Sequence, residues 1–278
     1  MRNHTIAIQG SLSSFHDLAA KKHFGNDITL VECNSFKDVC KQISENQVDY
    51  GIIAIENKIA GSILLNYQLI EEYDLNIIGE IYLPIELYLF AYPDTQLNEI
   101  KEIISHPMAL AQCQNFLSEQ KQINAKEYRD TATSAKIVSN EKNKHLGVIA
   151  GPQIGKEYNL TKIGENISDE KLNYTRFYIL SKGREVIQNA NKASIIIQLK
   201  NQIGVLSDVL SIFKHNSINL LKIQSLPSNN HTDIFSFHLD LTFNDRIQLD
   251  DSMKEINELI QLKKILGIYK GEDLINYN

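Results

Sequence analysis

The stretch of this chain that most constrains its fold is an almost continuously apolar run at residues 50–55, Tyr-Gly-Ile-Ile-Ala-Ile. A strand with one face in water alternates apolar and polar residues, whereas this run has no polar face. It therefore predicts a strand whose sheet is covered on both sides, as in α/β folds. The flanking sequence agrees, since short strands are expected at residues 5–8 and 28–31, with helices at residues 15–24 and 35–45.

The remaining pattern divides the chain into two α/β lobes followed by a smaller domain. We expect the chain to cross to the second lobe near residues 77–82 and to return after about residue 158, so that residues 1–182 form a hinged, cleft-bearing unit. A polar stretch at residues 182–192 predicts a linker. The order βαββαβ over residues 193–272 predicts a ferredoxin-like domain.

Composition and charge argue against several classes of function. Hydrophobic content of 43% and charged content of 22% are those of a soluble globular protein. A net charge of −6 argues against binding to nucleic acid or to an anionic membrane. Cys33, Cys40 and Cys113 form no disulfide framework, and the chain starts without an apolar leader, so we expect a cytoplasmic protein. The eight histidines lack metal-binding spacing, and no metal is expected.

One polar segment stands at the head of a predicted strand. Residues 173–177, Asn-Tyr-Thr-Arg-Phe, place a hydroxyl, a guanidinium and an aromatic ring in tandem. Strand heads beside a cleft often carry reacting groups, because the loops there are open and the scaffold is rigid. Taken alone, a Thr-Arg pair in a strand is most often structural, since Thr is an ordinary strand residue.

Three loops end where helices are expected to begin, at residues 10–14, 60–62 and 130–131. A helix N-terminus offers free N–H groups and the positive end of a dipole, so each loop is a potential anion site. Ser, Thr and Gly are also the preferred caps of ordinary helices. Only the three loops together, facing one cleft, would favour binding of a dicarboxylate.

Taken in chain order, five segments resemble the prephenate dehydratase family, which converts prephenate to phenylpyruvate. They are Ile55-Glu56-Asn57 with Gly61-Ser62, the stretch from Ser105-His106-Pro107 to Cys113, Asp130-Thr131-Ala132, residues 173–177, and Gly204-Val205-Leu206. The resemblance covers nearly the whole chain. It implies a two-lobed catalytic domain like a periplasmic binding protein at residues 1–182, and an ACT regulatory domain at residues 193–272.

The resemblance also implies a catalytic residue and a set of substrate contacts. We expect the Thr175 hydroxyl to assist departure of the ring hydroxyl by a hydrogen bond that strengthens in the transition state. Expected substrate-binding residues are Ser14, Glu56, Asn57, Ser105, Gln112, Thr131 and Arg176. Side chains alternate along a strand, so Arg176 contacts substrate only if the backbone is irregular there, and both outcomes stay open. His106 is read as a structural hydrogen-bonding residue rather than a general base, and no cofactor is implied.

Two positions depart from the family pattern. Residues 10–16 lack the Pro and the second Gly of the family's Gly-Pro-x-Gly-Thr-Phe-Ser, and Lys58 stands where a small hydroxyl residue is common. These departures put individual contacts in question and leave the expected reaction unchanged.

For regulation, the resemblance implies L-phenylalanine as an allosteric inhibitor. Its expected site comprises Gly204, Val205, Leu206, Gln224, Ser225, Leu226 and Pro227. Gln224 and Leu226 replace a Glu and an Arg of the family, which predicts a weaker electrostatic component. We expect a homodimer or homotetramer, because exposed sheet edges favour pairing. Two alternatives remain: an arogenate dehydratase, and a two-lobed sensor of amino acids or solutes without catalytic activity.

Overall fold

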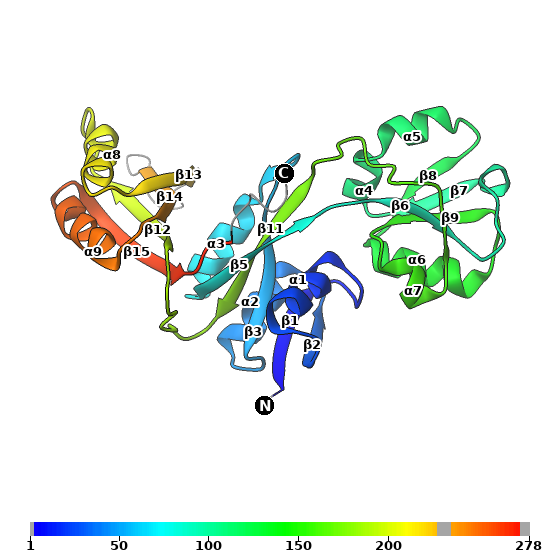
Figure 1. Ribbon diagram of the computed structural model, residues 1–278, viewed down its shortest axis with the longest axis horizontal. Coiled ribbons are helices and arrows are strands. Elements are labelled where there is room, and N and C mark those ends of the chain that lie inside the picture. The colour runs from blue at the N-terminus through cyan, green and yellow to red at the C-terminus, as the bar shows by residue number, and fades with distance from the viewer. Residues whose placement is uncertain (1–2, 227–234, 273–278) are drawn as a thin grey trace.

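The computed structural model describes residues 3–226 and 235–272, and these form three bodies, each built on its own sheet (Figure 1). The first lobe lies in the centre of the view, the second lobe at one end and the C-terminal domain at the other. Pro227, expected to contact phenylalanine, lies outside the described residues.

The first lobe has a central sheet in the order β2-β1-β3-β11-β5, with the short strand β4 paired to β3. Its elements are β1 (His4–Gln9), α1 (Phe15–Phe24), β2 (Ile28–Cys33), α2 (Phe36–Ser44), β3 (Tyr50–Asn57), β4 (Gly61–Ser62), α3 (Leu64–Glu72), β5 (Asn76–Pro84) and β11 (Tyr174–Ser181). Strand β1 is parallel to β2 and β3, whereas β11 runs antiparallel to β3 and β5. Helix α1 packs on one face and helices α2 and α3 on the other, which confirms that the run at residues 50–55 is covered on both sides.

Serine caps begin the first two helices. The Ser14 hydroxyl accepts from the N–H of Asp17, and the Ser35 hydroxyl accepts from the N–H of Asp38. The expectation that residues 60–62 open the third helix is wrong. Gly61, with a φ of 77°, turns the chain back so that β4 pairs with the end of β3, and α3 begins only at Leu64.

The second lobe has the strand order β10-β6-β9-β7-β8. Its elements are β6 (Tyr88–Ala91), η1 (Leu97–Glu99), β7 (Glu102–Ser105), α4 (Pro107–Ala111), α5 (Gln114–Glu119), β8 (Asn124–Glu127), α6 (Thr131–Glu141), β9 (Leu146–Ala150), α7 (Ile154–Tyr158) and β10 (Thr161–Ile163). The chain enters this lobe after Pro84, later than residues 77–82, because β5 pairs with β11 along its whole length. It returns between Ile163 and Tyr174.

The helix that follows β7 is broken in two at Gln112 and Cys113. The carboxylate of Asp169 accepts from the N–H groups of Gln114 and Asn115, so it stabilises the start of a separate helix, α5. This break leaves Gln112 at the end of α4, close to the segment that leads into β11.

The C-terminal domain has the antiparallel strand order β13-β14-β12-β15, the ferredoxin-like arrangement expected from the sequence. Its elements are β12 (Lys192–Leu199), α8 (Val205–His215), β13 (Asn219–Leu226), β14 (Phe235–Thr242), α9 (Arg246–Glu255), η2 (Ile256–Glu258) and β15 (Ile260–Tyr269). Both helices cover one face of the sheet. The other face shares a hydrophobic cluster with the first lobe, to which Ile196, Leu226 and Tyr269 belong.

Strand β15 lies close against strand β5 of the first lobe. A Cβ atom added at Gly267 would lie 2.0 Å from the carbonyl oxygen of Ile77, so this contact requires glycine. The two strands therefore hold the C-terminal domain against the first lobe by a direct approach of backbone to backbone.

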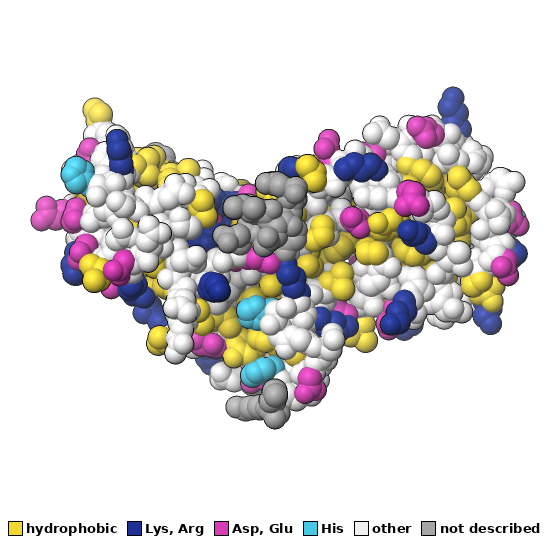
Figure 2. All heavy atoms as spheres, in the orientation of Figure 1, with side chains coloured by type: hydrophobic (Ala, Val, Ile, Leu, Met, Phe, Trp, Pro, Cys, Tyr) yellow, Lys and Arg dark blue, Asp and Glu magenta, His cyan; other side chains and the backbone are white. Residues whose placement is uncertain are grey.

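The surface carries both signs of charge. On the face drawn in Figure 2, basic and acidic side chains are interspersed over all three bodies without an extended patch of one sign. Throughout residues 3–226 and 235–272, every helix falls short of the length and apolarity that a membrane crossing needs. The same residues contain no group of three or more His, Cys, Asp or Glu side chains placed to hold a metal ion.

Candidate active site

The Thr175 hydroxyl is held by a single side chain at the point where β11 pairs with β3. Thr175 lies opposite Asn57 in this pair and is 9% exposed. The Asn57 carboxamide oxygen accepts from the N–H groups of Ile59 and Ala60, which fixes the amide orientation. Its Nδ2 therefore faces Thr175 and donates to Oγ1 at 3.0 Å. Because the Thr175 oxygen accepts here, and its hydroxyl donates to none of the described residues, its proton is free to bind a ligand oxygen.

A chain of amides extends from this pair into the second lobe. The Asn57 Nδ2 also donates to the side-chain oxygen of Asn173 at 2.9 Å and to the carbonyl oxygen of Tyr174 at 3.2 Å. Asn173 in turn donates to the Gln112 side-chain oxygen at 3.2 Å. Asn173 and Gln112 are both buried, and Gln112 belongs to the second lobe. The order Gln112, Asn173, Asn57, Thr175 thus connects the two lobes to the reactive hydroxyl.

This geometry changes the role expected for Asn57. Both of its amide groups are engaged within the chain, so the expected direct contact with substrate is not what the structure shows. Asn57 instead orients Thr175, and the Thr175 hydroxyl is the group left to donate outward. A hydroxyl fixed as an acceptor can stabilise charge that develops on a departing oxygen without reorganising.

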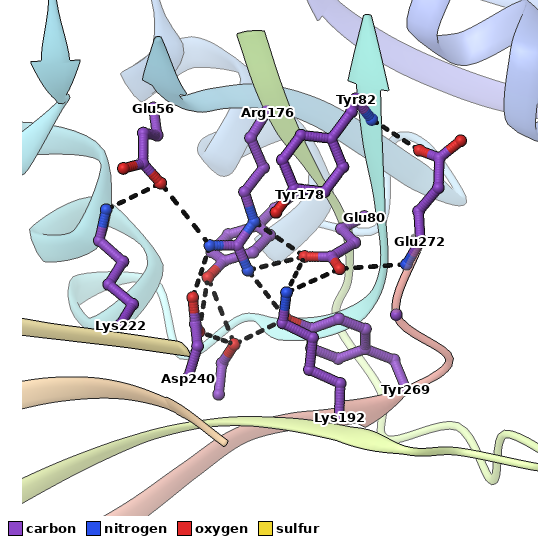
Figure 3. Close-up of polar contacts among 12 residues, drawn as sticks. Glu56, Glu80, Tyr82, Arg176, Tyr178, Lys192, Lys222, Asp240, Tyr269 and Glu272 are labelled. Carbon is purple, nitrogen blue, oxygen red and sulfur yellow. Dashed lines mark hydrogen bonds and ion pairs between the residues drawn. The ribbon is translucent and has the colours of Figure 1, made fainter. Parts of the chain in front are cut away.

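Arg176 and Glu56 lie opposite each other one residue further along and face the other side of the sheet. A β-bulge follows directly after Arg176. The Arg176 side chain is 2% exposed and binds Glu80 of β5 at 2.7 Å and Asp240 of β14 at 2.5 Å (Figure 3). The expected contact of Arg176 with substrate is therefore wrong for this structure, because strand alternation turns its guanidinium away from Thr175.

Glu56 also faces away from the Thr175 hydroxyl. Its carboxylate binds Lys222 of the C-terminal domain at 2.9 Å and lies 3.9 Å from Nη1 of Arg176. The expected role of Glu56 as a substrate ligand is not supported, since its partners are two cations of the protein. Figure 3 shows Glu56 between Lys222 and Arg176.

The Arg176 side chain belongs to a buried cluster with balanced charge. Lys192 binds Glu80 at 2.8 Å, so two cations meet the two carboxylates of Glu80 and Asp240. Burial by itself raises the pKa of a carboxyl group, but the Arg176 guanidinium holds the pKa of Asp240 well below its ordinary value. Burial, followed by the nearby Arg176, lowers the pKa of Lys192. Removing one partner of such a cluster leaves an unpaired buried charge, which is strongly destabilising.

The remaining expected residues lie at helix starts and in the second lobe. Ser14 caps α1, and Thr131 is the first residue of α6, whose cap is Asp130. Ser105 is fully buried and donates to the carbonyl oxygen of Ile149 at 2.5 Å, so the expected substrate contact is not supported. His106 caps α4 by accepting from the N–H of Met108, and burial lowers its pKa, in keeping with a structural role.

Comparison with known proteins decides the family. The family model described as prephenate dehydratase matches residues 6–185. The chain belongs to the prephenate dehydratase family. A prephenate dehydratase of Methanocaldococcus jannaschii is 33% identical over 263 residues, which cover 92% of this chain and 94% of that protein. An arogenate dehydratase/prephenate dehydratase of Arabidopsis thaliana is 37% identical over 226 residues, covering 80% of this chain and 57% of that protein.

A solved structure shows the same fold. The prephenate dehydratase of Arthrobacter aurescens, in complex with L-Phe, superimposes with a TM-score of 0.84 at 24% identity, covering 96% of this chain and 90% of that one. The two-lobed fold typical of periplasmic binding proteins is therefore that of prephenate dehydratases.

In this member of the prephenate dehydratase family, the two segments expected to bind phenylalanine do not line one pocket within the chain. Gly204, Val205 and Leu206 line a pocket of about 200 Å³ at the start of α8. Gln224 and Leu226 alternate with Ser225 along β13, and Leu226 packs into the cluster shared with the first lobe. The Gln224 amide donates to the Ser225 carbonyl oxygen.

Sequence reasoning missed three residues of this dehydratase site. Asn173 was part of the segment singled out, and its position between two other amides could not be seen from sequence. Lys222 and Asp240 lie on strands of the C-terminal domain and reach the first lobe. The only sequence signal for Asp240 is the polar series Ser236, His238, Asp240 at every second position of β14.

Proposed function

We propose that this protein catalyses the decarboxylating dehydration of prephenate to phenylpyruvate, with residues 1–182 as the catalytic unit and residues 193–272 as a regulatory ACT unit. The observation that carries this proposal is the Thr175 hydroxyl, which accepts from Asn57 and keeps its own proton for a ligand. The family membership supports the reaction class.

In the proposed reaction, the bond from the ring to its carboxylate breaks and carbon dioxide leaves. The electron pair of that bond enters the ring, and the ring C–O bond breaks, so that the ring becomes aromatic. The departing hydroxide takes a proton and leaves as water. Thr175 donates a hydrogen bond to that oxygen as negative charge develops on it, without transferring its proton fully, because an alcohol is too weak an acid at neutral pH. No redox step or covalent intermediate is needed.

The substrate carries two carboxylates, for which two helix starts are available. Helix α1 begins at Phe15 after the Ser14 cap, and helix α6 begins at Thr131. They lie in different lobes, and Gln153 of the second lobe donates to the carbonyl oxygen of Ser13 beside the first of these helix starts. We assign Ser14 and Thr131 to these carboxylates, since free N–H groups and the helix dipole favour anions there.

Feedback by L-phenylalanine is the second part of the proposal. The pocket at Gly204, Val205 and Leu206 offers free N–H groups at the start of α8, where Gly204 adopts a φ of 82°. The homologue of Arthrobacter aurescens is described in complex with L-Phe, which supports phenylalanine as the ligand.

We further propose a homodimer or homotetramer. The segment at Gln224 and Ser225 does not line the Gly204 pocket of its own chain, so a second copy would have to supply it. A cytoplasmic location is proposed as well, which the free and buried state of Cys33, Cys40 and Cys113 supports.

A spectrophotometric assay with prephenate and arogenate as separate substrates tests the function. We expect phenylpyruvate from prephenate, with a kcat/KM above that for arogenate. A preference for arogenate, with phenylalanine as the product, would favour an arogenate dehydratase. No turnover of either substrate would reject catalysis and favour a sensor.

A further inference from the structure

The two faces of the β3–β11 pair connect different parts of the molecule. Asn57 and Thr175 are opposite each other on the face of the reactive hydroxyl. Glu56 and Arg176 are opposite each other one residue away, and their side chains point to the other face. A shift of either strand that moves the second pair must therefore also move the first pair.

The C-terminal domain binds that second pair with matching charges. Lys222 of β13 binds Glu56 at 2.9 Å, and Asp240 of β14 binds Arg176 at 2.5 Å. Lys222 and Asp240 are themselves opposite each other in the β13–β14 pair. An acid and a base on one pair of strands thus face a base and an acid on the other, and Figure 3 shows both contacts side by side.

The Lys222 contact is specific and well shielded. Its side chain is 12% exposed, and Nζ also donates to the Ser62 hydroxyl at 2.8 Å. Ser62 belongs to β4, which pairs with the same end of β3. Lys222 therefore holds the end of β3 that carries Glu56 and Asn57.

The same strand β13 carries Gln224, Ser225 and Leu226, which the proposed function assigns to phenylalanine. Lys222 lies two residues before Gln224 on the same face of the strand. Leu226 packs in the cluster that joins the C-terminal domain to the first lobe. A displacement of β13 by a ligand would reach Lys222 along one continuous strand.

We propose that Lys222 and Asp240 are positioning residues for the reaction, which hold Glu56 and Arg176 and thereby set the geometry of Asn57 and Thr175. Phenylalanine inhibits by displacing β13, which withdraws Lys222 from Glu56. This inference rests on the proposed function, because it names the route by which the C-terminal domain regulates that same site. Neither residue contacts substrate.

The sharper variant to test is Lys222→Met. Asp240→Asn would leave the Arg176 guanidinium underpaired in the interior, so loss of folding would obscure its effect on catalysis. Lys222→Met removes one charge from a partly exposed pair and keeps the length of the side chain. Lys222→Arg, which keeps the charge, is the rescue variant.

Lys264→Met is a matched control. Lys264 also belongs to the C-terminal domain and binds the first lobe, with Nζ 2.7 Å from the Asp74 carboxylate. Asp74 follows helix α3 and belongs to neither β3 nor β11. The control therefore removes an ion pair between the same two bodies without touching the strands of the site.

Kinetics with prephenate and calorimetric titration with phenylalanine, both on the full chain, test the proposal. We expect Lys222→Met to lower kcat roughly ten- to a hundredfold at nearly constant KM, the scale of a small misplacement of a catalytic group. Phenylalanine should still bind to this variant and should inhibit it several-fold less than it inhibits the wild type, on the order of the usual allosteric coupling. Lys222→Arg should recover most of the turnover, and Lys264→Met should match the wild type.

The inference is overturned if Lys222→Met and Lys264→Met show the same kcat and the same inhibition by phenylalanine. Wild-type protein that fails to make phenylpyruvate overturns the proposed function, and this inference with it. An active wild type whose Lys222 variant remains fully active and fully inhibited overturns this inference alone.

Discussion

Replacing Thr175 by Val separates the catalytic role of its hydroxyl from its role in folding. The change keeps the shape of the side chain and removes one hydrogen bond, the 3.0 Å contact accepted from Asn57. Asn57 keeps two other acceptors, the side chain of Asn173 and the carbonyl oxygen of Tyr174. The loss of unfolding free energy should therefore be about 1 kcal/mol. For a chain of this size, that corresponds to a fall in Tm of about 2–4 °C.

The loss of activity should be far larger than the loss of stability. Removing a positioned donor commonly lowers turnover by roughly two to four orders of magnitude, or about 3–5 kcal/mol of transition-state stabilisation. We predict this fall in kcat with little change in KM, measured by formation of phenylpyruvate beside thermal unfolding of the same preparation. Thr175→Ser keeps the hydroxyl and should retain most of the turnover. A Val variant with more than a tenth of wild-type kcat would refute the role of the hydroxyl, and a fall in Tm much beyond the expected range would assign the loss to folding.

Three further predictions concern the amide chain, the domain contact and acid stability. Asn173→Leu should lower kcat, because it removes both the acceptor of Asn57 and the donor to Gln112; steady-state kinetics check this, and unchanged turnover would contradict it. Gly267→Ala should weaken docking of the C-terminal domain, since the new Cβ would meet the Ile77 carbonyl; calorimetry should then show two unfolding transitions in place of one. Burial lowers the pKa of His16 from 6.5 to about 4, so the unfolded chain takes up its proton first as the pH falls. His16→Leu should therefore flatten the loss of unfolding free energy between pH 6.5 and 4 by roughly 3 kcal/mol, as urea titrations at both pH values would show.

Local pattern accounts for much of the fold. The apolar run at residues 50–55 has no polar face, and the structure covers it on both sides. The βαββαβ order of the C-terminal domain likewise follows from periodicity and turn residues. The start of the third helix was misplaced, because Gly61 and Ser62 cap helices and form hairpins equally well, and only pairing with β3 decides between the two.

The site was harder to predict, because its contacts join segments that are distant in sequence. Alternation along a strand allowed for an Arg176 that faces away from Thr175, but no local signal identified Asp240 as its partner. Polar positions at every second residue of β14 resemble a solvent-facing side, and they are buried because the first lobe covers them. Asn57 was expected to contact substrate, and its actual role depends on two backbone N–H groups that only the folded turn places beside it.

A crystal structure of the protein with a bound, unreactive prephenate analogue tests the central claim most directly. We predict that Oγ1 of Thr175 lies within hydrogen-bond distance of the ring hydroxyl that departs, while Asn57 still donates to the same Oγ1. A structure in which another donor binds that ring hydroxyl, and Thr175 lies out of reach of it, would contradict the account.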